Sequence, residues 1–162
     1  MYVLARGDYA VRAMLTIAAA HGGLVKAGTL ATDQKIPPSF LQDILLELRR
    51  ADLLHSHRGV EGGYGLARSA ADISVGDVLR AVSGVLTVVR GLPAETTRYH
   101  GPAAGLGTVW LAVHRAIGDV VDRTSLADLL TRGGTPSRSS SRAEPDGNDA
   151  APVREPAPPT SA

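Results

Sequence analysis

Two histidines near the middle of the chain have the spacing of a metal-binding pair. His55 and His57 are two residues apart, so a β-strand would project both imidazoles to one face, where they could bind a transition metal. Asp8 or His100 could supply a third ligand if two chains came together. Histidines on a surface strand are more often solvated, or face a phosphate, than they bind a metal. We therefore keep metal binding as an alternative and not as the main prediction.

The residues needed for other reactive centres are missing or are placed differently. Cysteine is absent, which excludes disulfides, thiolate metal sites, cysteine nucleophiles and cysteine-ligated iron–sulfur clusters. The glycine-rich segment 59–65 precedes a short predicted strand and not a helix, which argues against a phosphate-binding loop. Ser125 and Asp128 have the spacing of a helix cap rather than of a nucleophile and its base. The sequence does not predict an enzyme.

Composition indicates one folded domain with an extension. The chain has 162 residues, of which 44% are hydrophobic and 20% charged, so a packed core is expected. The net charge is only +1, so any contact with nucleic acid must come from local basic patches. The longest stretch without a charged residue, 99–114, is too short and too rich in glycine to span a membrane. We expect a soluble, cytoplasmic protein with no membrane contact.

The first half of the sequence predicts three helices followed by a hairpin. Apolar spacing indicates helices over 9–21 and 28–34, and Pro37 and Pro38 begin a third helix that continues to residue 50. The third helix has an apolar side formed by Phe40, Leu41, Ile44, Leu45 and Leu48, and an opposite side formed by Ser39, Gln42, Asp43, Leu46, Glu47 and Arg50. Segments 53–58 and 64–67 have the character of strands joined by the turn 59–63.

The second half predicts further helices. Ser74 and Asp77 have capping-box spacing for a helix that ends near Ser83. Segment 86–89 is a candidate strand or extended connector, and a loop over 91–105 follows it. The longest helix then begins at Leu106 with a continuous apolar stripe that includes Trp110, whose expected role is packing at an interface. A short helix is expected over 124–130.

Two short helices joined by a tight turn and followed by a hairpin describe a winged helix-turn-helix. The predicted fold class is therefore mainly α with a small β-hairpin wing, plus a long C-terminal helix. A helix fits the major groove of DNA, and a hairpin with a glycine-rich tip can approach the minor groove or the backbone. The same order of elements also builds domains that bind proteins.

Four motifs in this order resemble the Rrf2 family of bacterial transcription regulators. They are residues 6–14 (RGDYAVRAM), 48–54 (LRRADLL), 58–64 (RGVEGGY) and 73–78 (ISVGDV). The family includes the iron–sulfur-cluster assembly repressor, the nitric-oxide-sensing repressor and the cysteine-metabolism repressor. The resemblance implies a homodimer that binds a near-palindromic double-stranded DNA operator, with the long helix around Trp110 forming most of the dimer contact.

The resemblance also implies which residues meet DNA. The recognition helix of the family matches residues 38–50 and its wing matches 58–64. The candidate DNA-binding residues are Ser39, Phe40, Gln42, Arg49, Arg50, Arg58, Gly59 and Tyr64. A planar amide such as Gln42 can donate to and accept from adenine. Arg58 would reach the minor groove or phosphates, and Arg49 and Arg50 would add charge toward the backbone.

The chain departs from the family pattern in three ways. Val60 and Glu61 replace the proline and the glycine or basic residue of the usual wing. Asp43 and Glu47 bring negative charge near the reading face, where they could repel phosphates, exclude wrong bases or accept from cytosine. The places of the three cluster-binding cysteines fall near Leu92, Arg98 and Ala104, none of which can bind iron. No cofactor is predicted.

These observations divide the chain into three predicted parts. Residues 1–84 form the winged helix-turn-helix domain and residues 85–133 the sensor-type loop and dimerisation helix. Residues 134–162 form a tail rich in proline and serine that is expected to be disordered.

The main prediction is a homodimeric transcription regulator, acting as a repressor, without an iron–sulfur cluster. The sequence does not specify its effector, and a small molecule, a partner protein and no effector at all remain alternatives. One alternative is an interaction module that has lost operator binding, since residues 35–68 carry five basic and four acidic side chains. Another is a regulator that responds to metal or pH through His55, His57 or His100.

Overall fold

A computed structural model describes residues 5–89 and 91–133 of the chain. The helices are α1 (Ala5–Ala19), α2 (Ala27–Gln34), α3 (Pro38–Arg50), α4 (Val75–Ser83), α5 (Leu106–Asp122) and α6 (Leu126–Gly133). The strands are β1 (Leu54–His57), β2 (Gly63–Leu66), β3 (Val88–Val89) and β4 (Leu92–Pro93), and two 3₁₀ turns, η1 (Ala94–Thr96) and η2 (Gly101–Ala103), precede α5. The tail predicted over 134–162 lies outside the described residues.

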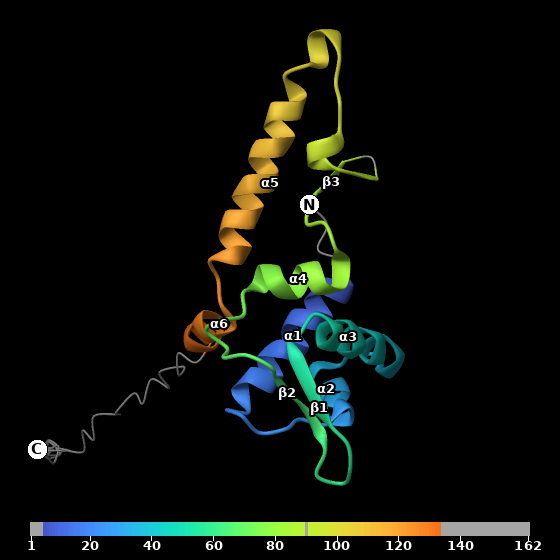
Figure 1. The fold of residues 1–162 in the computed structure, drawn as a ribbon, viewed down its shortest axis with the longest axis vertical. Coiled ribbons are helices and arrows are strands. Elements are labelled where there is room, and N and C mark those ends of the chain that lie inside the picture. The colour runs from blue at the N-terminus through green and yellow to red at the C-terminus, as the bar shows by residue number, and fades with distance from the viewer. Residues whose placement is uncertain (1–4, 90, 134–162) are drawn as a thin grey trace, which may run out of the picture.

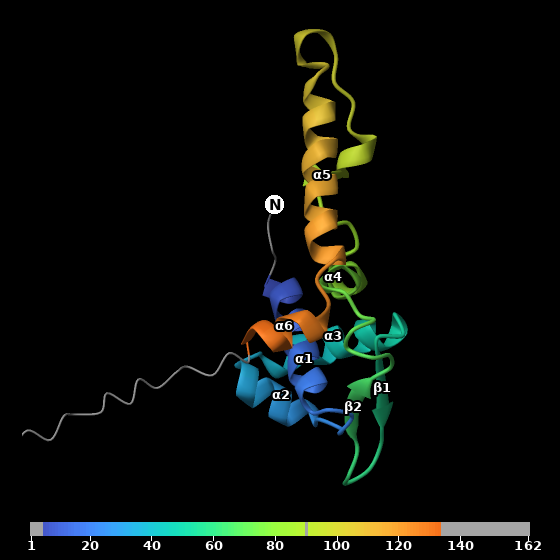
Figure 2. The ribbon, with the colours of Figure 1, turned by 90° about the vertical axis from the view of Figure 1, so that its left-hand side faces the viewer.

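The molecule consists of a compact body and a long projection. Helices α1 to α4, α6 and the β1–β2 hairpin form the body, and α5 with the loop before it forms the projection (Figure 1). The hairpin and α5 extend from opposite ends of the body, as the side view also shows (Figure 2). This arrangement confirms the mainly helical fold with a small hairpin wing.

Helix α1 is the centre of the body and contacts α2, α3, α4 and α6. Its buried side chains include Ala10, Met14 and Ile17, which meet Leu41, Ile44, Leu45 and Leu48 of α3 in one continuous core. The helix begins at Ala5, earlier than the predicted residue 9, although Arg6, Gly7 and Asp8 interrupt the apolar pattern. Gly7 is buried because α4 approaches so closely that a Cβ there would meet Leu79 at 3.0 Å.

The wing is a two-stranded antiparallel hairpin in which Leu54 pairs with Leu66 and His57 with Gly63. The outer edge of β2 is held by two backbone hydrogen bonds between Val25 and Tyr64, near the turn end of the hairpin. A Cβ at Gly63 would come within 2.7 Å of the Val25 carbonyl oxygen, so this position requires glycine. Strand β1 is two residues shorter than the predicted 53–58, and β2 has the predicted length but lies one residue earlier than 64–67. The Ala67 amide donates to the Leu53 carbonyl at 3.0 Å and closes the open end of the hairpin.

The capping motifs read from the sequence form as predicted. Ser74 and Asp77 make a reciprocal capping box at α4, with both hydrogen bonds at 3.0 Å. At α6 the Asp128 amide donates to the Ser125 hydroxyl oxygen at 3.1 Å, and the Ser125 amide donates to the Asp128 carboxylate at 2.9 Å. Because Ser125 is the cap, this helix runs over Leu126–Gly133 and not over 124–130.

The projection differs from the sequence prediction mainly in its loop. The candidate strand over 86–89 is reduced to Val88–Val89, which pairs with Leu92–Pro93. The loop predicted over 91–105 contains that second strand and both 3₁₀ turns, and η1 packs against α5. Helix α5 is the longest described helix, as predicted, with 17 residues. None of the helices over 5–89 and 91–133 is long and apolar enough to cross a membrane.

Candidate nucleic-acid interface

Helix α3 presents a mostly polar face to solvent because four of its apolar residues are buried on the other side. Pro38 occupies the first turn, and Leu41, Ile44, Leu45 and Leu48 are buried in the core. Ser39, Gln42, Asp43, Leu46 and Arg50 lie on the exposed side. A helix with this division can enter a groove without disturbing the core.

Phe40 does not belong to the apolar side of α3, where periodicity placed it. Half of its surface is exposed. Helical geometry puts Phe40 about 100° from Leu41, at the edge of the buried stripe and near the start of the helix. The sequence prediction was wrong about its burial, and the exposed ring remains available for contact outside the core.

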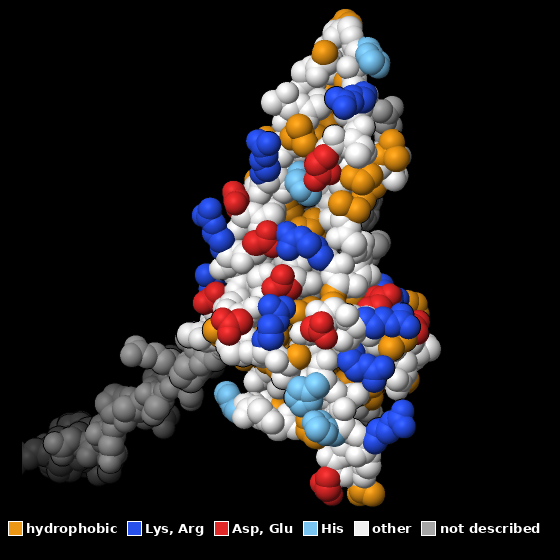
Figure 3. Space-filling model, in the orientation of Figure 1, with side chains coloured by type: hydrophobic (Ala, Val, Ile, Leu, Met, Phe, Trp, Pro, Cys, Tyr) orange, Lys and Arg blue, Asp and Glu red, His pale blue; other side chains and the backbone are white. Residues whose placement is uncertain are grey.

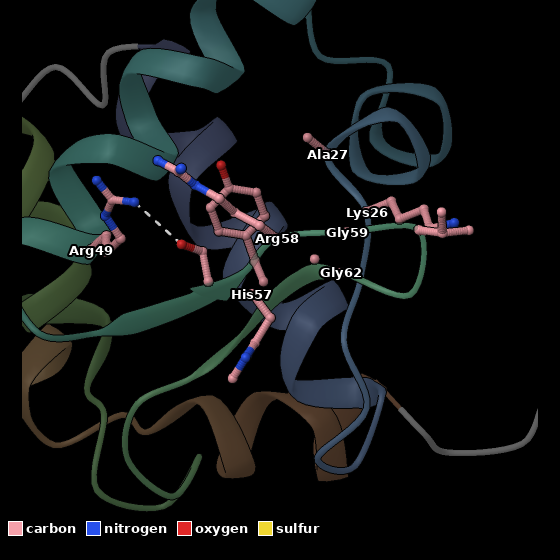
Figure 4. A pocket seen from close by; sticks show the side chains of 11 residues that line it. Lys26, Ala27, Arg49, His57, Arg58, Gly59 and Gly62 are labelled. Atoms are coloured by element: carbon pink, nitrogen blue, oxygen red, sulfur yellow. Dashed lines mark hydrogen bonds between the residues drawn. The ribbon is translucent and has the colours of Figure 1, made fainter.

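A groove of about 550 Å³ separates the wing from α3 and the start of α2. We call it the wing groove. Lys26, Arg49 and Arg58 contribute three cationic side chains to its lining, and no acidic residue lines it. Figure 4 shows Arg49 and Arg58 on one side of the groove and Lys26 on the other. A basic, open groove of this kind suits a phosphate backbone.

Local structure fixes the cations around the wing groove. Arg49 donates a hydrogen bond to the hydroxyl of Ser56 on β1 at 3.2 Å, which joins the end of the recognition helix to the wing. The wing turn begins at Gly59, whose φ of +114° favours glycine, and the Gly62 amide donates to the Gly59 carbonyl at 3.0 Å. Arg58 is therefore presented immediately before a tight, glycine-dependent turn.

A second hollow continues from the wing groove along α3. It has a volume of about 310 Å³ and is lined by Gln42, Asp43, Leu45, Leu46, Arg49 and Tyr64. Arg49 and Tyr64 line both hollows. The structure thus brings Gln42, Arg49, Arg58, Gly59 and Tyr64 onto one continuous surface. Ser39, Phe40 and Arg50 are exposed on α3 but line neither hollow.

Sequence reasoning missed three residues of the wing groove. Lys26, Ala27 and Ser56 line it together with the predicted residues, and His57, which the sequence marked as a metal-binding or phosphate-facing candidate, lines it too. Lys26 occupies the N-cap position of α2, so its charge reaches the wing only because Val25 pairs with Tyr64. A lysine in a connecting segment carries no local signal that would have identified it.

The two carboxylates on the exposed side of α3 have different surroundings. Glu47 forms an ion pair with Arg6 of α1 at 2.7 Å. Asp43 is exposed and forms no ion pair with any residue in the described ranges. The negative charge expected at the reading face is therefore compensated at one position and free at the other.

The histidine pair lies on the wing, where Figure 3 shows histidine side chains gathered over the lower part of the body. The rings of His55 and His57 are 5.2 Å apart and nearly perpendicular. Within the described residues, no group of three or more histidine, aspartate or glutamate side chains could hold a metal ion. His100 is exposed in the loop before α5, and Asp8 pairs instead with Arg12 at 3.1 Å.

The loop before α5 lacks the donors that an iron–sulfur cluster needs. Leu92 is in β4, Arg98 follows η1, and Ala104 is the C-cap residue after η2. An aliphatic side chain, a guanidinium and a methyl group cannot bind iron. The residues at these three positions do not fit a cysteine-ligated cluster.

The two sides of α5 differ. His114 pairs with Glu95 of η1 at 2.8 Å, and Trp110, one turn earlier, is partly buried within the same chain. An adjoining side of the helix carries exposed apolar residues: Leu106, Val109, Val113 and Val120. We call these four the α5 stripe. The predicted interface role of Trp110 stays a prediction.

Comparisons with known proteins agree on one family. The family model described as "Rrf2: Iron-dependent Transcriptional regulator" matches residues 3–132. The chain is 47% identical over 130 residues to the putative HTH-type transcriptional regulator Rv1287 of Mycobacterium tuberculosis, covering 80% of this chain and 81% of that protein. It is 29% identical over 132 residues to the HTH-type transcriptional regulator CymR of Bacillus subtilis, covering 81% and 91%.

Solved structures show the same fold. The structure of CymR, the global cysteine regulator of B. subtilis, matches with a TM-score of 0.70 at 28% identity, covering 82% of this chain and 98% of that one. The structure of T. potens IscR matches with a TM-score of 0.65 at 31% identity, covering 82% and 88%. The fold and the relatives are those of transcriptional regulators and not of enzymes.

Proposed function

The chain belongs to the Rrf2 family of DNA-binding transcriptional regulators, and from this premise we propose that it is a homodimeric repressor that works without an iron–sulfur cluster. Each protomer places α3 in the major groove of one operator half-site, while the wing follows the adjacent backbone. Repression follows from occupancy of the operator. As part of this proposal, the protein acts in the cytoplasm, where it meets the DNA.

The wing groove carries this proposal. Lys26, Arg49 and Arg58 converge on it from three separate elements, and no carboxylate lines it. Salt-dependent phosphate contacts from such cations supply much of the affinity of DNA-binding proteins and fix their register on the duplex. Ser39 and Gln42 are exposed near the start of α3, and we assign them the contacts to base edges that provide sequence preference.

The α5 stripe supports dimerisation. Its residues follow one another at spacings of three, four and seven, which is the spacing of a helix that packs against another helix. They remain exposed in the single chain, with Val109 at 52% and Val120 at 67%. Pairing the stripes of two chains would bury this surface and set two α3 helices at a fixed separation.

Control of binding is proposed to act through the loop 91–105 and the base of α5. The loop packs on α5 through η1 and the His114–Glu95 pair. The other end of α5 is fixed to α4 by an ion pair between Arg80 and Asp122 at 2.7 Å. A small molecule or protein that moved α5 would change the separation of the two reading helices.

A binding titration against genomic DNA fragments at two salt concentrations tests the proposal. We expect saturable, sequence-dependent binding that weakens steeply as salt rises, because bound phosphates release counterions. Absence of binding even at low salt would instead identify the protein as an interaction module that keeps the fold. Sedimentation of the free protein tests the dimer, and a monomer at micromolar concentration would contradict it.

A further inference from the structure

Helix α3, which we propose as the recognition helix, carries two negatively charged side chains on its surface. Asp43 and Glu47 are one helical turn apart on the part of α3 that is not buried in the core. Carboxylates near a phosphate backbone are repulsive, and that repulsion is strongest where solvent is excluded. A mechanism that removes one of these charges would therefore bear directly on DNA affinity.

Arg6 compensates the charge of Glu47. Its guanidinium lies 2.7 Å from the Glu47 Oε2 atom, and that oxygen is completely covered from solvent. Only 28% of the Arg6 side chain and 36% of the Glu47 side chain are exposed. Arg6 comes from the first turn of α1, which packs along α3 in the core. The pair is thus held by two helices whose relative position is fixed.

Asp43 offers the contrast within the same helix. It is exposed and has no ion pair in the described part of the chain. It also lines the hollow that continues from the wing groove, together with Gln42 and Arg49. Glu47 lines neither hollow. The free carboxylate therefore lies on the surface assigned to DNA, and the compensated one is drawn toward α1.

We propose that Arg6 is a positioning residue for DNA binding, which neutralises Glu47 and holds its carboxylate away from the docked duplex. This inference rests on the proposed function, since it assumes that α3 enters DNA. It assigns Arg6 no direct contact with a phosphate. Without Arg6, the Glu47 carboxylate is free to swing toward the backbone and repel it.

The test is a cycle of variants measured against one duplex, which the wild-type protein selects from random-sequence DNA. Arg6→Gln should weaken binding about threefold to tenfold, as expected for an uncompensated charge at the edge of an interface. Glu47→Gln should change affinity by less than about twofold. The double variant R6Q/E47Q should return to within about twofold of wild type, because the repelling charge is gone. Arg6→Lys, which keeps the charge, should retain most of the affinity.

Two controls separate this role from a structural one. Asp43→Asn removes an uncompensated carboxylate and should strengthen binding to non-cognate DNA, whereas Glu47→Gln should not. Arg115→Gln removes an exposed arginine on α5, far from α3, and should have no effect. Thermal unfolding of every variant checks that the fold is intact.

The outcomes distinguish the two proposals. If the wild-type protein selects a duplex but R6Q/E47Q binds as weakly as R6Q, Arg6 contacts DNA itself and the positioning role is wrong. If R6Q binds as well as wild type, the positioning role is also wrong, because the Glu47 carboxylate then needs no compensation. If the wild-type protein selects no duplex at all, the proposed function fails and the role of Arg6 fails with it.

Discussion

The guanidinium of Arg80 on α4 and the carboxylate of Asp122 at the end of α5 lie 2.7 Å apart. The same carboxylate occupies the space beside Gly76, where a methyl group would overlap it. Next to this contact, the Val75 amide donates to the Thr124 carbonyl at 2.9 Å and the Leu126 amide to the Ile73 carbonyl at 3.0 Å. The projection is therefore joined to the body by this ion pair and by these two backbone hydrogen bonds. We call this contact between α4 and the end of α5 the joint.

The joint makes Gly76 an exception among helical glycines. Alanine in place of glycine in a helix interior normally stabilises the fold by about 0.5 to 1 kcal/mol. In Gly76→Ala the new methyl group must push Asp122 away from Arg80, so we expect no gain in the free energy of unfolding. Gly118→Ala is the matched control, because its Cβ would meet only Asp122 at an ordinary 3.8 Å. Urea unfolding at one protein concentration compares them, and an equal gain for both variants would contradict this view of the joint.

The ion pair at the joint should also appear in the pH dependence of stability. The hydrogen bond from Arg80 lowers the pKa of the Asp122 carboxyl from its usual value, and the same bond raises the pKa of Arg80. A lowered native pKa stabilises the fold above the unfolded pKa, near 4, and this contribution disappears as pH falls through the native value.

Asp122→Asn should therefore destabilise the protein at neutral pH by about 0.3 to 1 kcal/mol, a modest amount because both side chains are nearly half exposed. The cost should vanish well below pH 4. Unfolding by urea at pH 7 and in strong acid measures the difference. A cost that is the same at both pH values would show that the charge of Asp122 is not what stabilises the joint.

Substitutions of Arg58 and Gln42 should affect DNA binding in different ways. Arg58→Ala removes a cation of the wing groove, so we expect weaker binding to all sequences and a salt slope reduced by about one. Gln42→Ala should mainly relax sequence preference, costing about 1 to 3 kcal/mol on a matched operator and little on a scrambled one. Titrations of both variants on both duplexes decide the matter. Equal losses everywhere would contradict this division between phosphate and base contacts.

The α5 stripe can be tested with a single charge. Val113→Asp places a carboxylate among Leu106, Val109 and Val120, where pairing with a second chain would bury it. We expect the dimer dissociation constant to rise at least about tenfold, which sedimentation equilibrium measures. Arg115→Asp introduces the same side chain on another side of the helix and should leave the dimer intact. Dimerisation of V113D with unchanged affinity would place the interface elsewhere.

Several elements could be predicted from the sequence because their signals are local. Pro38 and the spacing of Leu41, Ile44, Leu45 and Leu48 predicted α3 with its correct bounds. Ser74 and Asp77 predicted the capped start of α4. Local periodicity was less reliable at the edges of helices, where it placed Phe40 on the apolar side of α3 although half of its surface is exposed. It also missed the first turn of α1, because packing against Leu79 overrides the poor helix propensity of Gly7.

The sequence by itself determined which faces are apolar, which residues cap helices and which family the chain resembles, since all of these depend on neighbours along the chain. Only the tertiary structure decided which charges meet. Arg6 reaches Glu47, Arg80 reaches Asp122, and Lys26 joins Arg58 at the wing groove, although each pair is separated by more than thirty residues of chain. Periodicity reports that a side is exposed, but the partner of an exposed charge depends on how two helices pack, and that packing is set by the buried residues beneath them.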